Sequence, residues 1–199
     1  MATKTSSFES DTLEKETEKK SQKTKGSNGK ESLKKIFEEL LQDTYSAETQ
    51  IVEALPELAK ASHSEDLQEA FETHLTQTKK QIERLEKIFD RLRIEKKGEK
   101  CKAMEGLVEE GKKIIKEHTD NVTRDVALII AAQKVEHYEI AAYGSLVELA
   151  DVLNLDKVAD ILETTLEEEK ETDELLSDIA QQVNDEAFEY NGNEYSFQS

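Results

Sequence analysis

The sequence contains one proline, one cysteine and no tryptophan among its 199 residues. A single cysteine cannot form a disulfide within the chain or a thiolate metal cluster, so both kinds of site are excluded. Proline is nearly absent while 36% of the residues are charged, a composition typical of long helices. These scarcities favour an all-helical protein of a reducing compartment.

Long apolar runs are also missing. No segment approaches the ~20 apolar residues that a helix needs to cross a bilayer. The first ten residues, MATKTSSFES, lack the apolar centre of a signal peptide. We therefore expect a cytoplasmic protein without a membrane partner.

Positive charge is scarce outside the N-terminal region. The formal net charge is −18, and residues 1–30 hold seven lysines and five acids, so the remainder carries −20. Binding a phosphate backbone requires clustered positive charge, which excludes nucleic acid as a partner. An acidic body is compatible with handling cations or with solubility alone.

Both ends of the chain lack a periodic pattern of large apolar residues. Residues 1–30 are rich in Ser, Thr, Lys and Glu, and such a segment cannot bury enough apolar surface to offset its ordering entropy. We predict a disordered polar tail there and a loose C-terminal tail over residues 184–199. The folded domain is then residues 31–183.

Between the tails, apolar residues recur with the helical period in four long segments. These cover about 33–61, 64–93, 122–153 and 156–183. Pro56 falls inside the first segment and is expected to bend or restart that helix, because proline lacks a backbone donor and clashes with the preceding turn.

Loop lengths predict the topology. The first and second segments are joined by a few residues, as are the third and fourth, so each pair should be antiparallel. Residues 94–121 form a much longer connection that contains the short amphipathic segment GLVEEGKKIIKEH. A crossover of this length makes the second and third helices parallel. We therefore predict a ferritin-like four-helix bundle with one long crossover carrying a short extra helix.

Polar residues interrupt all four apolar stripes near their middles. A buried carboxylate is costly unless something pairs with it, and oxygen-rich ligation with an occasional imidazole suits iron or manganese. One polar break per helix at comparable depth therefore predicts a metal site in the bundle core. The candidate ligands are Glu48, His74, Glu136, Glu139, Glu169 and Asp173.

Each candidate also has a simpler interpretation. A lone histidine on an apolar stripe, such as His74, is more often a satisfied core residue than a ligand. In so acidic a chain Glu48 could lie on a solvated flank, and Tyr143 could fill the core with its hydroxyl bonded to a neighbour. A shared metal site is favoured because all four helices carry a polar interruption at comparable depth.

Five segments resemble, in order and spacing, the YciE/YciF family of ferritin-like proteins. They are SAETQIVEALPELAKAS, HLTQTKKQIERLEKIF, CKAMEGLVEEG, AAQKVEHYEIAAYGSLVELA and TLEEEKETDELL. The resemblance covers about residues 33–179. It implies a ferritin-like bundle, a homodimer, a link to bacterial stress responses and a rubrerythrin-like di-iron centre at the six candidate ligands.

The chain departs from the di-iron pattern in two ways. No Glu-x-x-His occurs on the four long helices, and Gln81 stands where some relatives carry His. The site would therefore be poor in histidine. His137 belongs to the EHYEIAAYG segment but lies one position off the stripe, so we expect it to turn aside from the metals.

The leading hypothesis is a non-haem dinuclear iron protein, a candidate di-iron oxidase or ferroxidase that oxidises Fe(II) with O₂ or peroxide. Glu136 and Glu169 would bridge two iron or manganese ions. Tyr143 is the candidate catalytic residue, which could hydrogen-bond a ligand or quench a radical. The rival hypothesis is a non-enzymatic, stress-associated dimeric bundle whose polar layer serves packing. An iron-storage cage is less favoured, since nothing in the sequence specifies assembly.

Overall fold

Five α-helices make up the computed structural model, which describes the backbone of residues 8–190 and the side chains of residues 29–189. No strand occurs within residues 8–190, which confirms the all-α class. The helices are α1 (Phe8–Ala61), α2 (Glu65–Leu92), α3 (Lys102–Glu117), α4 (Asn121–Val152) and α5 (Asp156–Tyr190).

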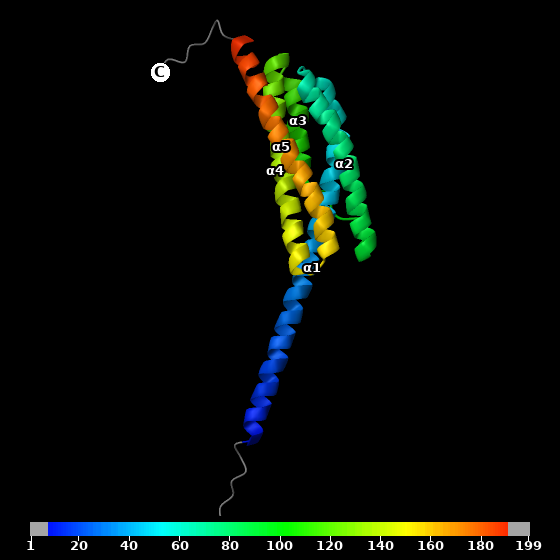
Figure 1. The fold of residues 1–199 in the computed structure, drawn as a ribbon, viewed down its shortest axis with the longest axis vertical. Helices are drawn as coiled ribbons and strands as arrows, with labels where there is room; N and C mark the ends of the chain where they lie inside the picture. The colour runs from blue at the N-terminus through cyan, green and yellow to red at the C-terminus, as the bar shows by residue number, and fades with distance from the viewer. Residues whose placement is uncertain (1–7, 191–199) are drawn as a thin grey trace, which may run out of the picture.

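Four of the helices form an antiparallel bundle (Figure 1). α1 and α5 run upward in this view, while α2 and α4 run downward, so α2 and α4 are parallel as the crossover predicts. Around the bundle α1 contacts α2, α2 contacts α5, α5 contacts α4 and α4 contacts α1. The short α3 lies in the crossover and packs against α1 and α4.

The N-terminal part of α1 extends beyond the other helices in Figure 1. The sequence predicts a tail without regular structure over residues 1–30, whereas the backbone is helical from Phe8 onward. The prediction rests on the scarcity of large apolar residues in this segment. A helix can still form there, because Lys and Glu are good helix formers and residues 8–30 contain no proline to stop it. Residues 1–7 lie outside the described residues.

The C-terminal helix is also longer than predicted. α5 continues to Tyr190, so the first part of the segment 184–199, expected to be loose, is helical. The remainder, residues 191–199, lies outside the described part of the chain. Again the predicted boundary marks where apolar periodicity ends, and a helix can continue past that point.

α1 continues through Pro56, so the helix does not restart there, and a bend at Pro56 stays a prediction. A proline removes one backbone hydrogen bond and leaves a carbonyl of the preceding turn without its partner. Pro56 is exposed. Water can therefore bond that carbonyl, and packing on both sides keeps the helix in one piece.

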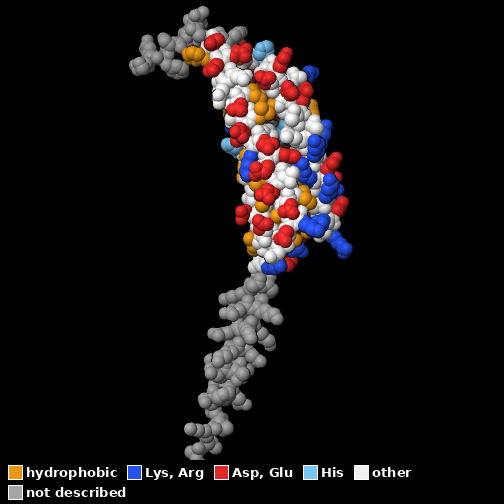
Figure 2. All heavy atoms as spheres, viewed as in Figure 1, with side chains coloured by type: hydrophobic (Ala, Val, Ile, Leu, Met, Phe, Trp, Pro, Cys, Tyr) orange, Lys and Arg blue, Asp and Glu red, His pale blue; other side chains and the backbone are white. Residues whose placement is uncertain are grey.

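The surface of the bundle is predominantly acidic. In Figure 2 acidic side chains are scattered over the face formed by α4 and α5, while Lys and Arg side chains gather along the right-hand edge, over α2. Within residues 8–190 none of the helices combines the length and the apolar character that crossing a bilayer would take.

The core consists of two apolar clusters separated by a polar layer. One cluster, at the α3 end, is built around Ile51, Leu55, Phe71, Leu128 and Leu176. The other, at the opposite end, is built around Phe37, Leu85, Phe89, Leu146 and Leu162. Apart from Asp125 on α4, the buried polar residues of the long helices fall in the region where these two sets meet. The layer comprises Thr44, Glu48, His74, Thr78, Gln81, Glu136, Glu139, Thr165, Glu169 and Thr172.

A buried aspartate joins the start of α2 to α4. Asp125 accepts the backbone N–H of His63 at 3.0 and 2.9 Å and that of Ser64 at 2.6 Å. Ser64 in turn caps α2, because its hydroxyl accepts the backbone N–H of Leu67. This junction sets the position of α2 relative to α4, and hence of any side chains that the two helices bring together.

We expect Asp125→Ala to lower the free energy of unfolding by about 2–3 kcal/mol, because two buried backbone donors lose their acceptor. Urea denaturation followed by circular dichroism measures the change. Asp151→Ala, at an exposed position on the same helix, is the control and should change stability little. Equal effects of the two substitutions would contradict the assigned role of Asp125.

Candidate metal centre

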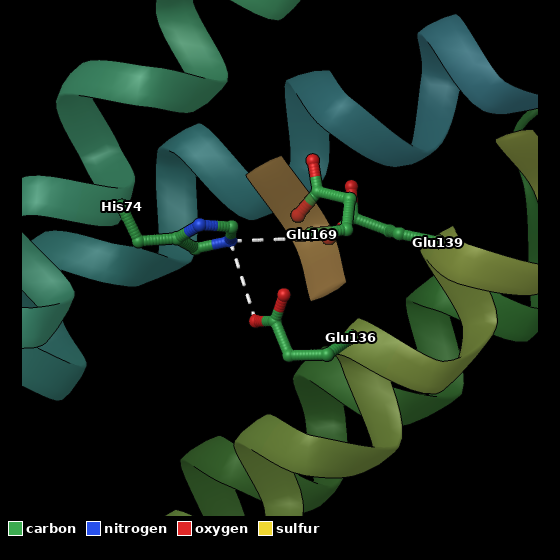
Figure 3. Close-up of side chains that lie close together, drawn as sticks. All are labelled: His74, Glu136, Glu139 and Glu169. Carbon is green, nitrogen blue, oxygen red and sulfur yellow. Dashed lines mark ion pairs between the residues drawn. The ribbon is translucent and has the colours of Figure 1, made fainter. Parts of the chain in front are cut away.

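Four buried side chains from three helices converge in the polar layer. They are His74 on α2, Glu136 and Glu139 on α4, and Glu169 on α5. One potential ligand atom from each lies within 4.8 Å of those of the other three. Figure 3 shows the imidazole of His74 pointing into the space between the carboxyl groups.

Helical spacing explains why α4 supplies two members. Glu136 and Glu139 are three residues apart and therefore share one face of the helix. The Nε2 atom of His74 lies 3.4 Å from Oε1 of Glu136 and 3.8 Å from Oε2 of Glu139, the two contacts dashed in Figure 3. Burial lowers the pKa of His74 to about 4, so the imidazole is neutral and has a lone pair to offer.

A fourth carboxyl group reaches the layer from α1. Glu48 is fully buried, and its Oε1 atom accepts a short hydrogen bond from the hydroxyl of Tyr143. Glu48 and Glu139 come within hydrogen-bonding reach of each other, as do Glu136 and Glu169. The glutamates thus form two facing pairs, and all four long helices contribute to the layer.

Most of the potential ligand atoms of this group have no hydrogen-bond partner. Buried polar atoms in native proteins are nearly always bonded. Among the described residues, the buried side-chain atoms without a partner are concentrated in this layer. They include both ring nitrogens of His74, both oxygens of Glu139, and one oxygen each of Glu48, Glu136 and Glu169.

Comparisons with known proteins identify the family. The profile described as "Domain of unknown function (DUF892)" matches residues 32–189. Protein YciF of Escherichia coli strain K12 is 49% identical over 150 residues, which are 75% of this chain and 90% of YciF. The chain belongs to the DUF892 family.

Solved structures agree with this assignment. The crystal structure of the E. coli stress protein YciF superposes with a TM-score of 0.75 at 48% identity, over 77% of this chain and 97% of YciF. YcfI from Rhodopseudomonas palustris gives a TM-score of 0.71 at 38% identity, over 73% and 92% of the two chains. A Xanthomonas campestris protein, at 22% identity and a TM-score of 0.64, shares the fold.

The electrostatics of the DUF892 chain favour a bound proton or cation in the layer. Burial raises the pKa of Glu48 and of Glu136 to about 8. Burial likewise raises the pKa of Glu139 and Glu169 well above the usual range, and the charges of neighbouring glutamates raise it further. Four carboxylates cannot all ionise at neutral pH in this dry space unless positive charge enters with them.

The nearest guanidinium is already neutralised. Arg84 donates to both oxygens of Glu168, at 2.5 and 2.6 Å, so its charge is paired beside the layer. Gln81 donates to Oε1 of Glu169 at 2.5 Å and to Oε2 of Glu168 at 3.1 Å. Sequence reasoning missed the Arg84–Glu168 pair. The feature of the sequence that could have indicated this pair is Arg84, a basic residue three positions after Gln81 on the same face of α2.

Asp173 lies at the rim rather than in the group of four. Its side chain is 23% exposed, and its Oδ2 atom lies 3.2 Å from Nε2 of His137. His137 is 69% exposed, as expected from its position off the stripe. The other oxygen of Asp173 is buried without a partner. The predicted ligands His74, Glu136, Glu139 and Glu169 are thus brought together, Glu48 adjoins Glu139, and Asp173 stands apart.

Raising the pH from about 6.5 to about 8 should destabilise the metal-free DUF892 chain. The folded-state pKa of Glu48 and of Glu136 is raised from 4.5 to about 8. Their stabilising contribution is therefore fully present below pH 4.5 and is lost progressively as the pH rises towards 8, by roughly 1–2 kcal/mol for each between pH 6.5 and 8. The pKa of His74 is lowered, so its contribution is lost only as the pH falls from 6.5 towards 4.

Urea midpoints of chelator-treated protein at the two pH values test this prediction. A divalent cation added at the higher pH should recover the lost stability, because it replaces the protons. A midpoint that increases with pH in the absence of metal would show that the carboxyl groups are not buried as described.

Proposed function

We propose that this chain is a dinuclear iron or manganese protein that oxidises Fe(II) with O₂ or peroxide in a stress response. The observation that carries the proposal is the set of buried carboxylate and imidazole atoms without a hydrogen-bond partner. A stress-response role is supported by the 48% identity to a structure described as the E. coli stress protein YciF.

The donor set fits two divalent cations. Glu48, Glu136, Glu139 and Glu169 are all buried, and their four negative charges equal the charge of two such ions. His74 adds a neutral nitrogen ligand. Oxygen-rich donors with one imidazole suit iron or manganese better than softer metals. A cation would turn the cost of burying these acids into coordination.

His74, Glu136, Glu139 and Glu169 would hold the ions, with Glu48 beside them as a further ligand. Asp173, the sixth predicted ligand, lies at the rim and is left out of this set. Glu136 and Glu169, whose oxygen atoms lie close together, would each offer carboxylate oxygens to these ions. When bound, two iron ions would supply one electron each, enough to reduce O₂ with two protons to hydrogen peroxide, or peroxide with two protons to water.

Hydrogen bonds from neighbouring side chains orient the proposed ligands. The Tyr143 hydroxyl holds one oxygen of Glu48, and the Gln81 amide holds one oxygen of Glu169, so in each case the second oxygen stays free for a cation. Burial raises the pKa of Tyr143, and the charge of Glu48 raises it further, so this phenol keeps its proton. We propose Tyr143 as the catalytic residue that supplies a hydrogen bond beside the metals.

Anaerobic titration with Fe(II) should show uptake of about two ions per chain, because the layer holds four negative charges. Admission of air should then produce an oxygen-dependent absorbance change in the near ultraviolet. Equilibrium dialysis and stopped-flow absorbance are the measurements. Binding of fewer than one ion per chain, with no change on exposure to air, would contradict the proposal.

Replacing Glu136 with Gln separates the proposal from the rival, in which the layer serves only packing. A dinuclear centre should lose iron uptake and oxidation, while the metal-free protein becomes more stable at pH 8 because a buried acid is removed. Glu148→Gln, at an exposed position on the same helix, is the control and should leave both unchanged. If Glu136→Gln keeps full oxidation rates, the layer is structural.

A further inference from the structure

A small cavity opens where α3 covers the seam between α1 and α4. The space that the centre of a water-sized sphere can occupy in it is about 40 Å³. α3 supplies Val108 and Ile115 to its wall, α1 supplies Leu55, and α2 supplies Phe71. The cavity is therefore a product of the crossover helix, which the four-helix bundle alone would not enclose.

Small residues leave the space open. Ala54 on α1, Ala131 and Ala132 on α4, and Gly111 on α3 all line the cavity. A Cβ atom added at Gly111 would lie 3.4 Å from a methyl group of Leu58 on α1, so α3 and α1 approach closely there. Larger side chains at these positions would fill the cavity.

The cavity reaches the candidate metal centre. His74 and Glu136, two members of the buried group, belong to its lining. Two other polar lining residues, Glu57 and Lys112, are exposed and mark the solvent side. The remaining wall is apolar, so the cavity connects the surface near α3 with the His74–Glu136 edge of the layer.

Polar contacts hold the start of α3 in place, so the cavity is preformed. The backbone N–H of Cys101 donates to Ser46 at 3.0 Å, and its carbonyl accepts from Gln50 at 3.2 Å. The sulfur of Cys101 lies 3.1 Å from the hydroxyl of Tyr138, which donates to Asp43 at 2.6 Å. Cys101 thereby ties α3 to both α1 and α4.

We propose that this cavity binds dioxygen and delivers it to the His74–Glu136 edge, which makes O₂ rather than peroxide the oxidant. An apolar wall of this kind accepts small apolar ligands. Hydrogen peroxide would lose its hydrogen bonds to water on entering, whereas O₂ has none to lose. This inference rests on the proposed function and adds the class of oxidant.

Xenon binding tests the cavity without any metal. A crystal of metal-free protein pressurised with xenon should show xenon between α3, α1 and α4. Ala54→Leu adds an isopropyl group at the wall and should abolish the site. Ala159→Leu is the control, because Ala159 is equally buried, with both residues 6% exposed, but lies in the apolar cluster at the opposite end of the bundle. It should retain the xenon.

The reaction with oxygen tests delivery. With Fe(II) bound anaerobically, Ala54→Leu should slow the O₂-dependent absorbance change severalfold at unchanged iron stoichiometry, while Ala159→Leu should keep the wild-type rate. The inference is overturned if wild-type protein binds no xenon in the cavity, or if Ala54→Leu loses xenon but reacts with O₂ at full rate. Failure of wild-type protein to take up iron refutes the proposed function instead, and the xenon result still decides whether the cavity takes an apolar gas.

Discussion

Burial of negative charge in the middle of a helical bundle is the constraint on which the rest of this structure depends. Four glutamates reach one dry layer, and the one guanidinium that hydrogen-bonds at its edge among the described side chains is already paired with Glu168. Such an arrangement is unfavourable unless protons or cations compensate it. The layer is therefore both the weakest part of the metal-free fold and the part best suited to hold metal.

Apolar packing on both sides of the layer offsets the free-energy cost of burying these acids. Each long helix contributes to a cluster above and a cluster below, so none of the helices can slide or rotate without breaking contacts in both. Hydrogen bonds then set individual side chains. Tyr143 and Gln81 each hold one carboxylate oxygen and leave the other free, so the free oxygens are kept in fixed positions where a cation could bind.

Much of the candidate site could be predicted because the helical period places polar breaks at matching depths. The predicted ligands that meet in the structure lie on or close to the centre of the buried stripes: His74, Glu136, Glu139 and Glu169. Asp173 is the predicted ligand that the helical period misplaces. Four residues after Glu169 it is rotated by roughly 40° from it about the helix axis, which is enough to put it at the rim beside His137. The Arg84–Glu168 pair was missed because it depends on how α2 and α5 face each other.

By itself the sequence determined the helical class, the order and approximate limits of the packed helices, the antiparallel and parallel relations set by loop length, and the residues able to ligate a metal. These follow from period, composition and connection length, which are local properties. Only the tertiary structure decided which of those ligands meet, which oxygen atoms lack donors, and that α3 encloses an apolar cavity ending at His74 and Glu136. Those features depend on the rotation and spacing of helices distant in the chain, and packing sets both.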